Sequence, residues 1–175
     1  MTSKSRPPGM QTHPATFSSK RLLADSALQR IRRGGPGGQR RNKVETGVVL
    51  RHLPTGIAAE ASERRHQREN LPLAVRRLRL NLAVGVRVPA ADGPSPLWQR
   101  RCRSGRIVVS EDHQDFAAIL AEALDTLAGT EWDHRAAATT LGCSPTQLVR
   151  LIGRCRKALE LVNQRRAGLG LRTLK

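Results

Sequence analysis

Residues 33–61 read RGGPGGQRRNKVETGVVLRHLPTGIAAEA and join a glycine-rich segment to a clear strand pattern. Four glycines surround one proline at residues 34–38. Glycine costs conformational entropy on folding, so such a segment is expected where the backbone adopts conformations closed to other residues or closely approaches a ligand. Residues 47–53 then alternate as a strand, residues 54–56 supply a turn, and residues 57–61 can return as the partner strand. We therefore predict an ordered loop beside a β-hairpin.

The elements on either side of this stretch complete a small α+β domain. Leu28 and Ile31 suit a short strand before the loop. Asn70 is predicted as the N-cap of a helix that tolerates Pro72 in its first turn. We place this domain, a sheet or hairpin with one helix, at residues 25–88. The apolar stripe of its helix has helical spacing and consists of Leu71, Val75, Leu78 and Leu82.

The rest of the chain is predicted to end in an all-α region. Residues 1–24 show no sustained apolar period and are interpreted as a disordered basic arm. Proline and glycine punctuate residues 89–112, which we interpret as a linker. Residues 113–175 carry helical patterns, one ended by Gly142 and a single long one capped by Ser144. The predicted organisation is thus an α+β domain followed by a basic helical domain.

The chain is strongly basic. Its 175 residues include 31 Lys and Arg against 14 Asp and Glu, a formal net charge of +17. Such a chain is expected to bind a polyanion, with nucleic acid first and an anionic membrane surface second. Aromatic residues make up only 2% and Tyr is absent, which disfavours modules that stack bases on aromatic side chains.

Signals for membrane insertion, metal binding and cofactors are missing from the sequence. No segment approaches the roughly 20 apolar residues that cross a bilayer, and no apolar stretch near the N-terminus indicates a secretory signal. The three cysteines are odd in number and lack metal-ligand spacing. We expect a cytoplasmic protein that has no membrane partner and binds neither a metal nor a cofactor. The mitochondrial matrix is the alternative, because the N-terminus is basic and rich in Ser and Thr.

Two nucleotide-binding motifs fail at the glycine segment. A P-loop needs Lys followed by Ser or Thr after its last glycine, but Gln39 and Arg40 stand there. A dinucleotide fingerprint that starts at Gly35 needs a glycine where Arg40 stands. A flexible linker stays open as an interpretation, although the hairpin pattern downstream weakens it.

Several ordered blocks of this region resemble the class I peptide chain release factors. Gly-Pro-Gly-Gly-Gln-x-x-Asn-Lys, at residues 35–43, is similar to the catalytic loop of that family. The resemblance continues through residues 45–46, residues 52–57 and residues 65–70. It covers roughly residues 27–83. The sequence departs from the family pattern at Arg40 and Arg41, where His-Val is usual, and at His66, where Ser is frequent.

The resemblance implies a peptidyl-tRNA hydrolase, a carboxylic ester hydrolase that acts in the ribosome on the ester between a nascent peptide and its tRNA. It implies Gly37, Gly38 and Gln39 as the catalytic residues. In this family the equivalent of Gln39 supplies a backbone N–H for the developing negative charge, and its side chain helps to admit water. The two glycines permit the backbone shape. No metal and no cofactor are implied.

The implied partners are the ribosome, through its rRNA, and the P-site peptidyl-tRNA, bound by a monomer. Arginine is preferred where two parallel hydrogen bonds hold a phosphate. Basic and polar side chains near the loop and in the C-terminal helices are therefore the predicted RNA-binding residues: Arg32, Arg33, Arg40, Arg41, Asn42, Lys43, Arg65, Arg150, Arg154, Arg156, Lys157, Arg165 and Arg166.

The position of the loop indicates which kind of relative is most similar. A loop that starts at residue 34 leaves no room for a decoding domain before it, and none is recognisable after it. The chain therefore resembles the short, stand-alone relatives that rescue stalled ribosomes by codon-independent hydrolysis. Residues 136–148 also resemble a helix-turn-helix hairpin. The alternatives are a non-catalytic ribosome-associated RNA-binding relative and a helix-turn-helix DNA-binding regulator.

Overall fold

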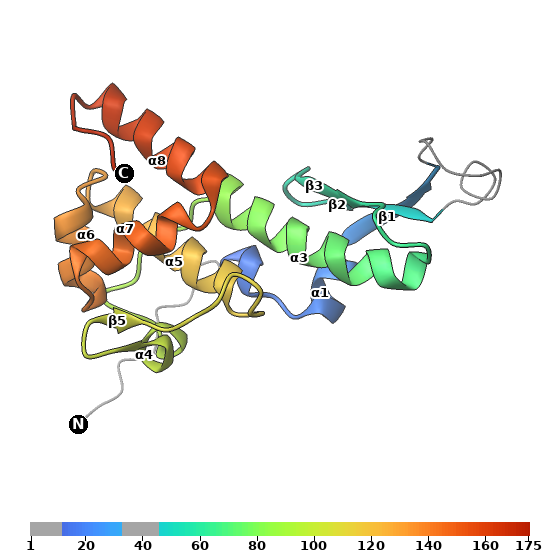
Figure 1. Ribbon diagram of the computed structural model, residues 1–175, viewed down its shortest axis with the longest axis horizontal. Helices are drawn as coiled ribbons and strands as arrows, with labels where there is room; N and C mark the ends of the chain where they lie inside the picture. The colour runs from blue at the N-terminus through green and yellow to red at the C-terminus, as the bar shows by residue number, and fades with distance from the viewer. Residues whose placement is uncertain (1–11, 33–45) are drawn as a thin grey trace. The chain divides into compact units, whose positions relative to one another are not determined.

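The computed structural model describes residues 12–32 and 46–175, which adopt an α+β fold (Figure 1). The fold divides into two units, Pro14–Gly85 and Val86–Lys175, the latter joined by residues 12–13. The first unit contains a three-stranded sheet, and the second is mainly helical. The first unit begins with a 3-10 turn and a short helix, η1 (Pro14–Thr16) and α1 (Ser19–Ala24).

The sheet of the first unit is antiparallel, with strand order β1-β2-β3. Strand β1 (Ser26–Ile31) pairs along its whole length with β2 (Gly47–His52), and β2 pairs with β3 (Ala58–Ala61). Gly56 in the β2–β3 turn has a φ of +70°, a conformation that favours glycine. Its amide donates to the His52 carbonyl at 2.8 Å. The predicted hairpin is confirmed.

Alternate side chains of β2 pack against one long helix. Helix α3 (Gln67–Gly85) covers one face of the sheet (Figure 1). Val48, Leu50 and His52 are buried, whereas Arg51 between them is exposed, as the period of two in a strand requires. The core is completed by the buried residues of α3, which are Asn70, Ala74, Val75, Leu78, Leu82 and Ala83.

The prediction of a disordered arm over residues 1–24 is wrong for residues 12–24, which contain η1 and α1. Residues 1–11 lie outside the described part of the chain. The Leu22 side chain is only 1% exposed. The Arg79 guanidinium on α3 donates to the Phe17 carbonyl at 3.1 Å. One buried leucine and one long-range arginine contact hold this short segment. Neither creates a local apolar period, which explains why the sequence pattern suggested disorder.

The second unit is built around one apolar helix. Helix α5 (Phe116–Gly129) buries most of its residues. Trp98 is 1% exposed, and its indole Nε1 donates to the Leu141 carbonyl at 2.8 Å, so it acts as a packing anchor. The remaining elements are α4 (Pro96–Arg101), β4 (Cys102–Arg103), β5 (Arg106–Ile107), α6 (His134–Leu141), α7 (Pro145–Gly153) and α8 (Arg156–Gly168).

The predicted linker, residues 89–112, contains a helix and a hairpin instead of irregular chain. Ser95 caps α4, and its backbone N–H and its hydroxyl both donate to the Glu122 carboxylate of α5 at 2.6 Å. Pro96 occupies the first turn of α4, where proline is tolerated. The prediction failed because local proline and glycine content does not reveal a carboxylate partner on a distant helix.

The single long helix predicted after Ser144 is two helices. Helix α7 ends at Gly153, and α8 starts at Arg156. Glycine is a poor helix former, and the Arg154 guanidinium that follows it donates to the Val109 carbonyl. The apolar stripe continues through the break, so periodicity alone did not indicate it.

His13 is expected to make the stability of the second unit depend on pH. Its side chain is 7% exposed, and its Nε2 lies 3.2 Å from the Val86 carbonyl oxygen. Burial lowers its pKa from 6.5 to about 4. Protonation therefore favours the unfolded state, and the stability that neutral His13 contributes is lost as the pH falls from 6.5 toward 4.

We expect the wild type to lose about 2 kcal/mol of unfolding free energy relative to His13→Gln between pH 7 and pH 5. Burial raises the pKa of Asp125 to about 6, which acts in the opposite direction over part of the same range. Both proteins contain Asp125, so the comparison isolates His13. Denaturant unfolding at the two pH values measures the difference, and equal losses in both proteins would contradict the expectation.

Candidate functional site

The glycine loop connects β1 to β2. Both ends of this connection are described, and they lie side by side, because Ile31 pairs with Gly47 at the last position of the two strands. Residues 32–46 therefore leave and rejoin the sheet at one end of the β1–β2 ladder. The predicted catalytic and RNA-binding residues Gly37, Gly38, Gln39, Arg33, Arg40, Arg41, Asn42 and Lys43 lie outside the described residues.

Gly47 is packed too closely for any side chain. A Cβ added to Gly47 would lie 2.7 Å from Ile31 Cγ1 and 3.0 Å from the Ile31 carbonyl oxygen. It would also lie 3.2 Å from Ser62 Cβ. Glycine at this position lets the end of β1 and the chain that precedes α3 approach the residue where the connection rejoins the sheet.

Asn70 joins the same point to the chain before α3. The residue is 0% exposed. Its Nδ2 donates to the Thr46 carbonyl at 2.8 Å and to the Arg64 carbonyl at 3.0 Å, and its Oδ1 accepts from the Arg64 N–H at 2.9 Å. We call Ile31, Thr46, Gly47, Arg64 and Asn70 the loop root.

The prediction of Asn70 as an N-cap is wrong. Helix α3 begins at Gln67, and the backbone N–H of Asn70 already donates to the His66 carbonyl at 3.3 Å. Asparagine near the start of a helix is usual as a cap. The sequence therefore offered no reason to expect that Asn70 instead contacts the distant Thr46 carbonyl. The signal that could have shown this contact is the family-like block at residues 65–70, which ends on this asparagine.

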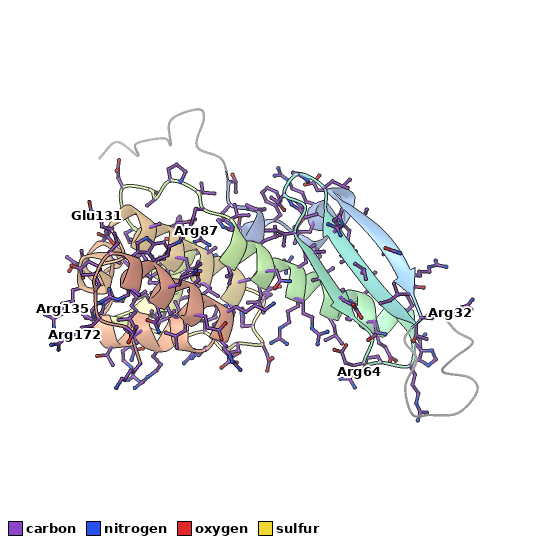
Figure 2. All side chains as sticks on the ribbon, turned by 90° about the horizontal axis from the view of Figure 1, so that it is seen from above. Arg32, Arg64, Arg87, Glu131, Arg135 and Arg172 are labelled. Atoms are coloured by element: carbon purple, nitrogen blue, oxygen red, sulfur yellow. The ribbon has the colours of Figure 1, made fainter. Side chains whose placement is uncertain are left out.

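Exposed arginines lie in the loop root and next to it in the sequence. Figure 2 shows Arg32 and Arg64 at the same end of the first unit. Arg32, Arg64 and Arg65 are all exposed. Arg32 and Arg65 were predicted to bind RNA, whereas Arg64 is added by the structure. The described side of the candidate site is therefore a backbone junction held by a buried amide and flanked by guanidinium groups.

Comparison with known proteins places this junction in a family domain. The RF-1 domain family matches residues 23–93, which hold the whole three-stranded sheet and α3. Two similar proteins are the chloroplastic peptide chain release factor PrfB1 of Arabidopsis thaliana, 49% identical over 60 residues, and peptide chain release factor 1 of Acidiphilium cryptum, 41% identical over 70 residues. Residues 23–93 therefore carry an RF-1 domain that is similar to part of these peptide chain release factors.

The matches to these relatives cover only part of each chain. The match to the Arabidopsis protein covers 34% of this chain and 13% of that protein, and the Acidiphilium match covers 40% and 20%. Peptide chain release factor 1 of Xylella fastidiosa is 39% identical over 82 residues, which are 47% of this chain and 23% of that protein. The chain thus spans less than a quarter of the length of these relatives. No solved structure matches it.

Beyond the RF-1 domain, most of the predicted RNA-binding side chains are accessible. Arg150, Arg156, Lys157 and Arg165 are exposed on α7 and α8. Arg156 forms an ion pair with Glu160 at 2.8 Å, but its side chain stays 92% exposed. Such a surface pair contributes little energy and can be exchanged for a phosphate. Arg154 is half-buried and uses its guanidinium to hold the Val109 carbonyl.

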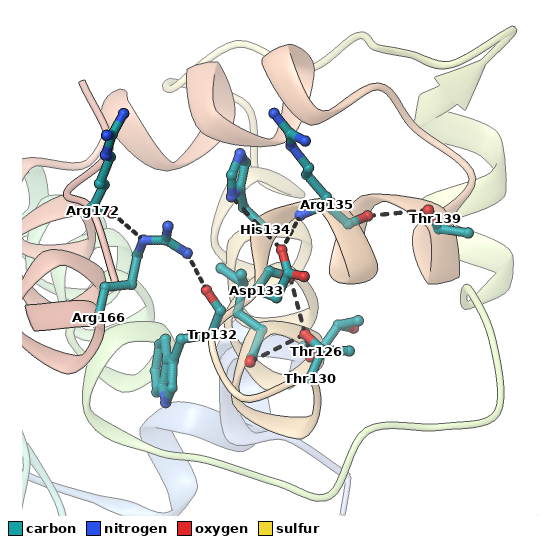
Figure 3. A network of polar contacts seen from close by, with 10 residues as sticks. Thr126, Thr130, Trp132, Asp133, His134, Arg135, Thr139, Arg166 and Arg172 are labelled. Atoms are coloured by element: carbon teal, nitrogen blue, oxygen red, sulfur yellow. Dashed lines mark hydrogen bonds and ion pairs between the residues drawn. The ribbon is translucent and has the colours of Figure 1, made fainter. Parts of the chain in front are cut away.

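Arg166 is a correction to the predicted RNA-binding set. The residue is 5% exposed. Its Nε donates to the Arg172 carbonyl at 2.8 Å, and its Nη1 donates to the Trp132 carbonyl. Figure 3 shows the guanidinium between these two partners. Its donors point into the unit, where they hold the chain after α8 and the turn before α6, so Arg166 stabilises the fold instead of presenting charge to RNA.

The segment that resembles a helix-turn-helix forms two helices joined at Gly142, which has a φ of +64°. In DNA-binding proteins of this type the N-terminal residues of the second helix contact base edges. Here Gly105 of the β4–β5 turn accepts from the Ser144 N–H at 3.2 Å. The Gln147 side chain accepts from the Ile107 N–H at 3.3 Å. The start of α7 therefore faces the protein's own hairpin, which argues against the DNA-binding alternative.

Among residues 12–32 and 46–175, none of the helices combines the length and the apolar character that spanning a membrane requires. No group of three or more His, Cys, Asp or Glu side chains in the same residues could hold a metal ion.

Proposed function

We propose that this chain hydrolyses peptidyl-tRNA on the ribosome. The observation that carries the proposal is Gly37-Gly38-Gln39, placed by the sequence between two paired strands of an RF-1 domain. The domain links the chain to proteins named as peptide chain release factors. The loop root supports the proposal because it holds Thr46 and Gly47, the residues at which the connection that contains these three residues rejoins the sheet.

The chemistry of the loop sequence suits a reaction that relies on positioning. Residues 33–43 contain no Asp, Glu or His that could serve as a general base. In the proposed reaction a water oxygen attacks the ester carbonyl carbon, and the negative charge that develops on the carbonyl oxygen is met by the Gln39 backbone N–H. The carbon–oxygen bond to the tRNA ribose then breaks, and the ribose oxygen takes up the proton that the attacking water gives up. Preorganised N–H donors of this kind often make the largest single contribution to acyl-transfer catalysis.

Charge supports an RNA partner for the same domain. Residues 14–85 include 15 Lys and Arg against five Asp and Glu. Exposed arginines at the loop root would neutralise phosphates beside the acceptor end of the tRNA, as arginine does in many RNA complexes. The basic side chains of α7 and α8 would extend this contact to rRNA, in a protein that acts as a monomer without a cofactor.

We further propose that hydrolysis is codon-independent, as in rescue of stalled ribosomes. The exposed basic side chains of the second unit suit contacts to phosphates, and such contacts carry no sequence information. The low aromatic content of 2% also disfavours reading bases by stacking. A non-catalytic ribosome-associated relative is the second candidate, favoured by the departures at Arg40 and Arg41 from the family's usual loop.

Codon independence can be tested with ribosomes that carry labelled peptidyl-tRNA and either an empty A site, a sense codon or a stop codon. We expect peptide release on the empty A site, with no increase when a stop codon is supplied. Release that requires a stop codon would contradict the rescue assignment. Ribosome binding without release in all three cases would favour the non-catalytic candidate.

A further inference from the structure

We propose that Asn70 is a positioning residue of the release reaction. Its buried side-chain amide holds Thr46, the residue at which the β1–β2 connection that contains Gly37, Gly38 and Gln39 rejoins the sheet. This inference rests on the proposed function. Asn70 lies outside the loop sequence, and its side chain contacts Thr46 and Arg64.

The side-chain amide of Asn70 uses both of its N–H donors. Both Nδ2 hydrogens are used, one by the Thr46 carbonyl and one by the Arg64 carbonyl. The Oδ1 atom accepts from the Arg64 N–H. The side chain thus joins two backbone segments that are 18 residues apart in the sequence. No other natural side chain of this size supplies two donors and an acceptor in one plane.

The position of these contacts distinguishes Asn70 from an ordinary buried polar residue. Thr46 is the last residue of the connection before β2, and its neighbour Gly47 is packed against Ile31 and Ser62 without space for a side chain. The close packing fixes the location of the strand end, and the hydrogen bond from Asn70 fixes the direction of the peptide unit before it. A displacement of about 1 Å in a catalytic group can cost about 100-fold in rate.

The same amide couples the loop to two exposed arginines. By holding both the N–H and the carbonyl of Arg64, Asn70 determines where the Arg64 and Arg65 side chains leave the backbone. If those guanidinium groups contact tRNA or rRNA phosphates, the phosphate contact and the catalytic connection share one rigid support. Asn70 therefore links the backbone that carries these arginines to Thr46, where the connection rejoins the sheet.

The chain offers a matched control on the same helix. Asn81 also lies on α3 and donates its Nδ2 to a strand carbonyl, that of Ala58, at 2.8 Å. Ala58 pairs with Arg51, toward the other end of β2 from the loop root. Asn70→Asp and Asn81→Asp each replace an amide donor by an oxygen of nearly the same size. They differ in whether the lost contact belongs to the loop root.

The experiment measures single-turnover peptide release at saturating protein, the concentration for half-maximal release, and amide hydrogen exchange. We expect Asn70→Asp to lower the saturated rate by about 100-fold, with half-maximal concentration changed less than about threefold because charge-driven binding remains. We expect Asn81→Asp to keep the rate. The Arg64 and Gly47 amides should exchange faster in the first variant only. If Asn70→Asp does not fold, Asn70→Ser serves, since its hydroxyl cannot hold all three partners.

Each outcome separates this inference from the proposed function. Equal release rates for the two folded variants would overturn the positioning role while leaving the function in place. A wild type that releases no peptide would overturn the function, and with it the role of Asn70 in release. In that case the exchange data decide whether the Asn70 contacts hold the loop root at all, and unchanged exchange at Arg64 would reject that as well.

Discussion

Replacing Gln39 with proline is expected to lower the rate of peptide release by about 100- to 1,000-fold while ribosome binding persists. Proline has no backbone N–H, so the variant removes the donor that the proposed reaction directs at the developing negative charge. The loss of one such donor has about this effect in other acyl-transfer enzymes. Release is measured as labelled peptide freed in a single turnover on stalled ribosomes.

Gln39→Ala is the matched control for this prediction. Alanine keeps the backbone N–H and removes only the side chain, so we expect it to retain far more activity than the proline variant. Gly38→Ala tests the backbone instead, because a Cβ restricts the conformations that glycine can adopt. If both the alanine and the proline variant lost all release activity, the reaction would depend on the Gln39 side chain, and the assignment of the main role to its backbone N–H would be contradicted.

Ribosome binding is expected to weaken by about 1,000-fold between 50 mM and 200 mM salt if about six phosphates are neutralised. The expectation follows from the net charge of +17 and from the exposure of Arg32, Arg64, Arg65, Arg150 and Arg165. Each lost phosphate contact should reduce the slope of log affinity against log salt by about one. Binding at a series of salt concentrations measures the slope.

Arg165 and Arg166 provide a matched pair for this test, since they are neighbours with the same charge. Arg165 is exposed, whereas Arg166 is buried and holds the Arg172 and Trp132 carbonyls. We expect Arg165→Gln to reduce the salt slope and to leave the melting temperature unchanged. Arg166→Gln should lower the melting temperature and, where it is folded, keep the slope. A salt response that is flat for the wild type would contradict the assignment of the basic charge to RNA binding.

The β-hairpin and the helix of the RF-1 domain were predictable because each has a regular apolar period. Val48, Leu50 and His52 are buried and alternate with half-buried Val49 and exposed Arg51, and the buried leucines of α3 recur at helical spacing. These periods arise from one continuous core, so a local window of sequence contains the information. Residue type, and not periodicity, separated the loop from both nucleotide-binding motifs, because Gln39 and Arg40 stand where those motifs need other residues.

Features that depend on single contacts between distant segments were not predictable in this way. The contact of Arg79 with Phe17 orders the N-terminal helix, and the Glu122 carboxylate holds the start of α4. Their partners are more than 25 residues apart and leave no period in the sequence. Asn70 belongs to this class, because its type and position also suit an ordinary helix cap. For the same reason, the charge of Arg166 gave no sign of its burial.

We propose that the glycine loop of this RF-1 domain catalyses hydrolysis of peptidyl-tRNA. The most direct test adds the purified protein to ribosomes that hold labelled peptidyl-tRNA with an empty A site and follows the freed peptide. We predict release by the wild type at a rate well above that of the ribosomes alone, and its loss in Gln39→Pro. Stable binding of the wild type to these ribosomes, with the peptide still attached to its tRNA, would contradict the claim.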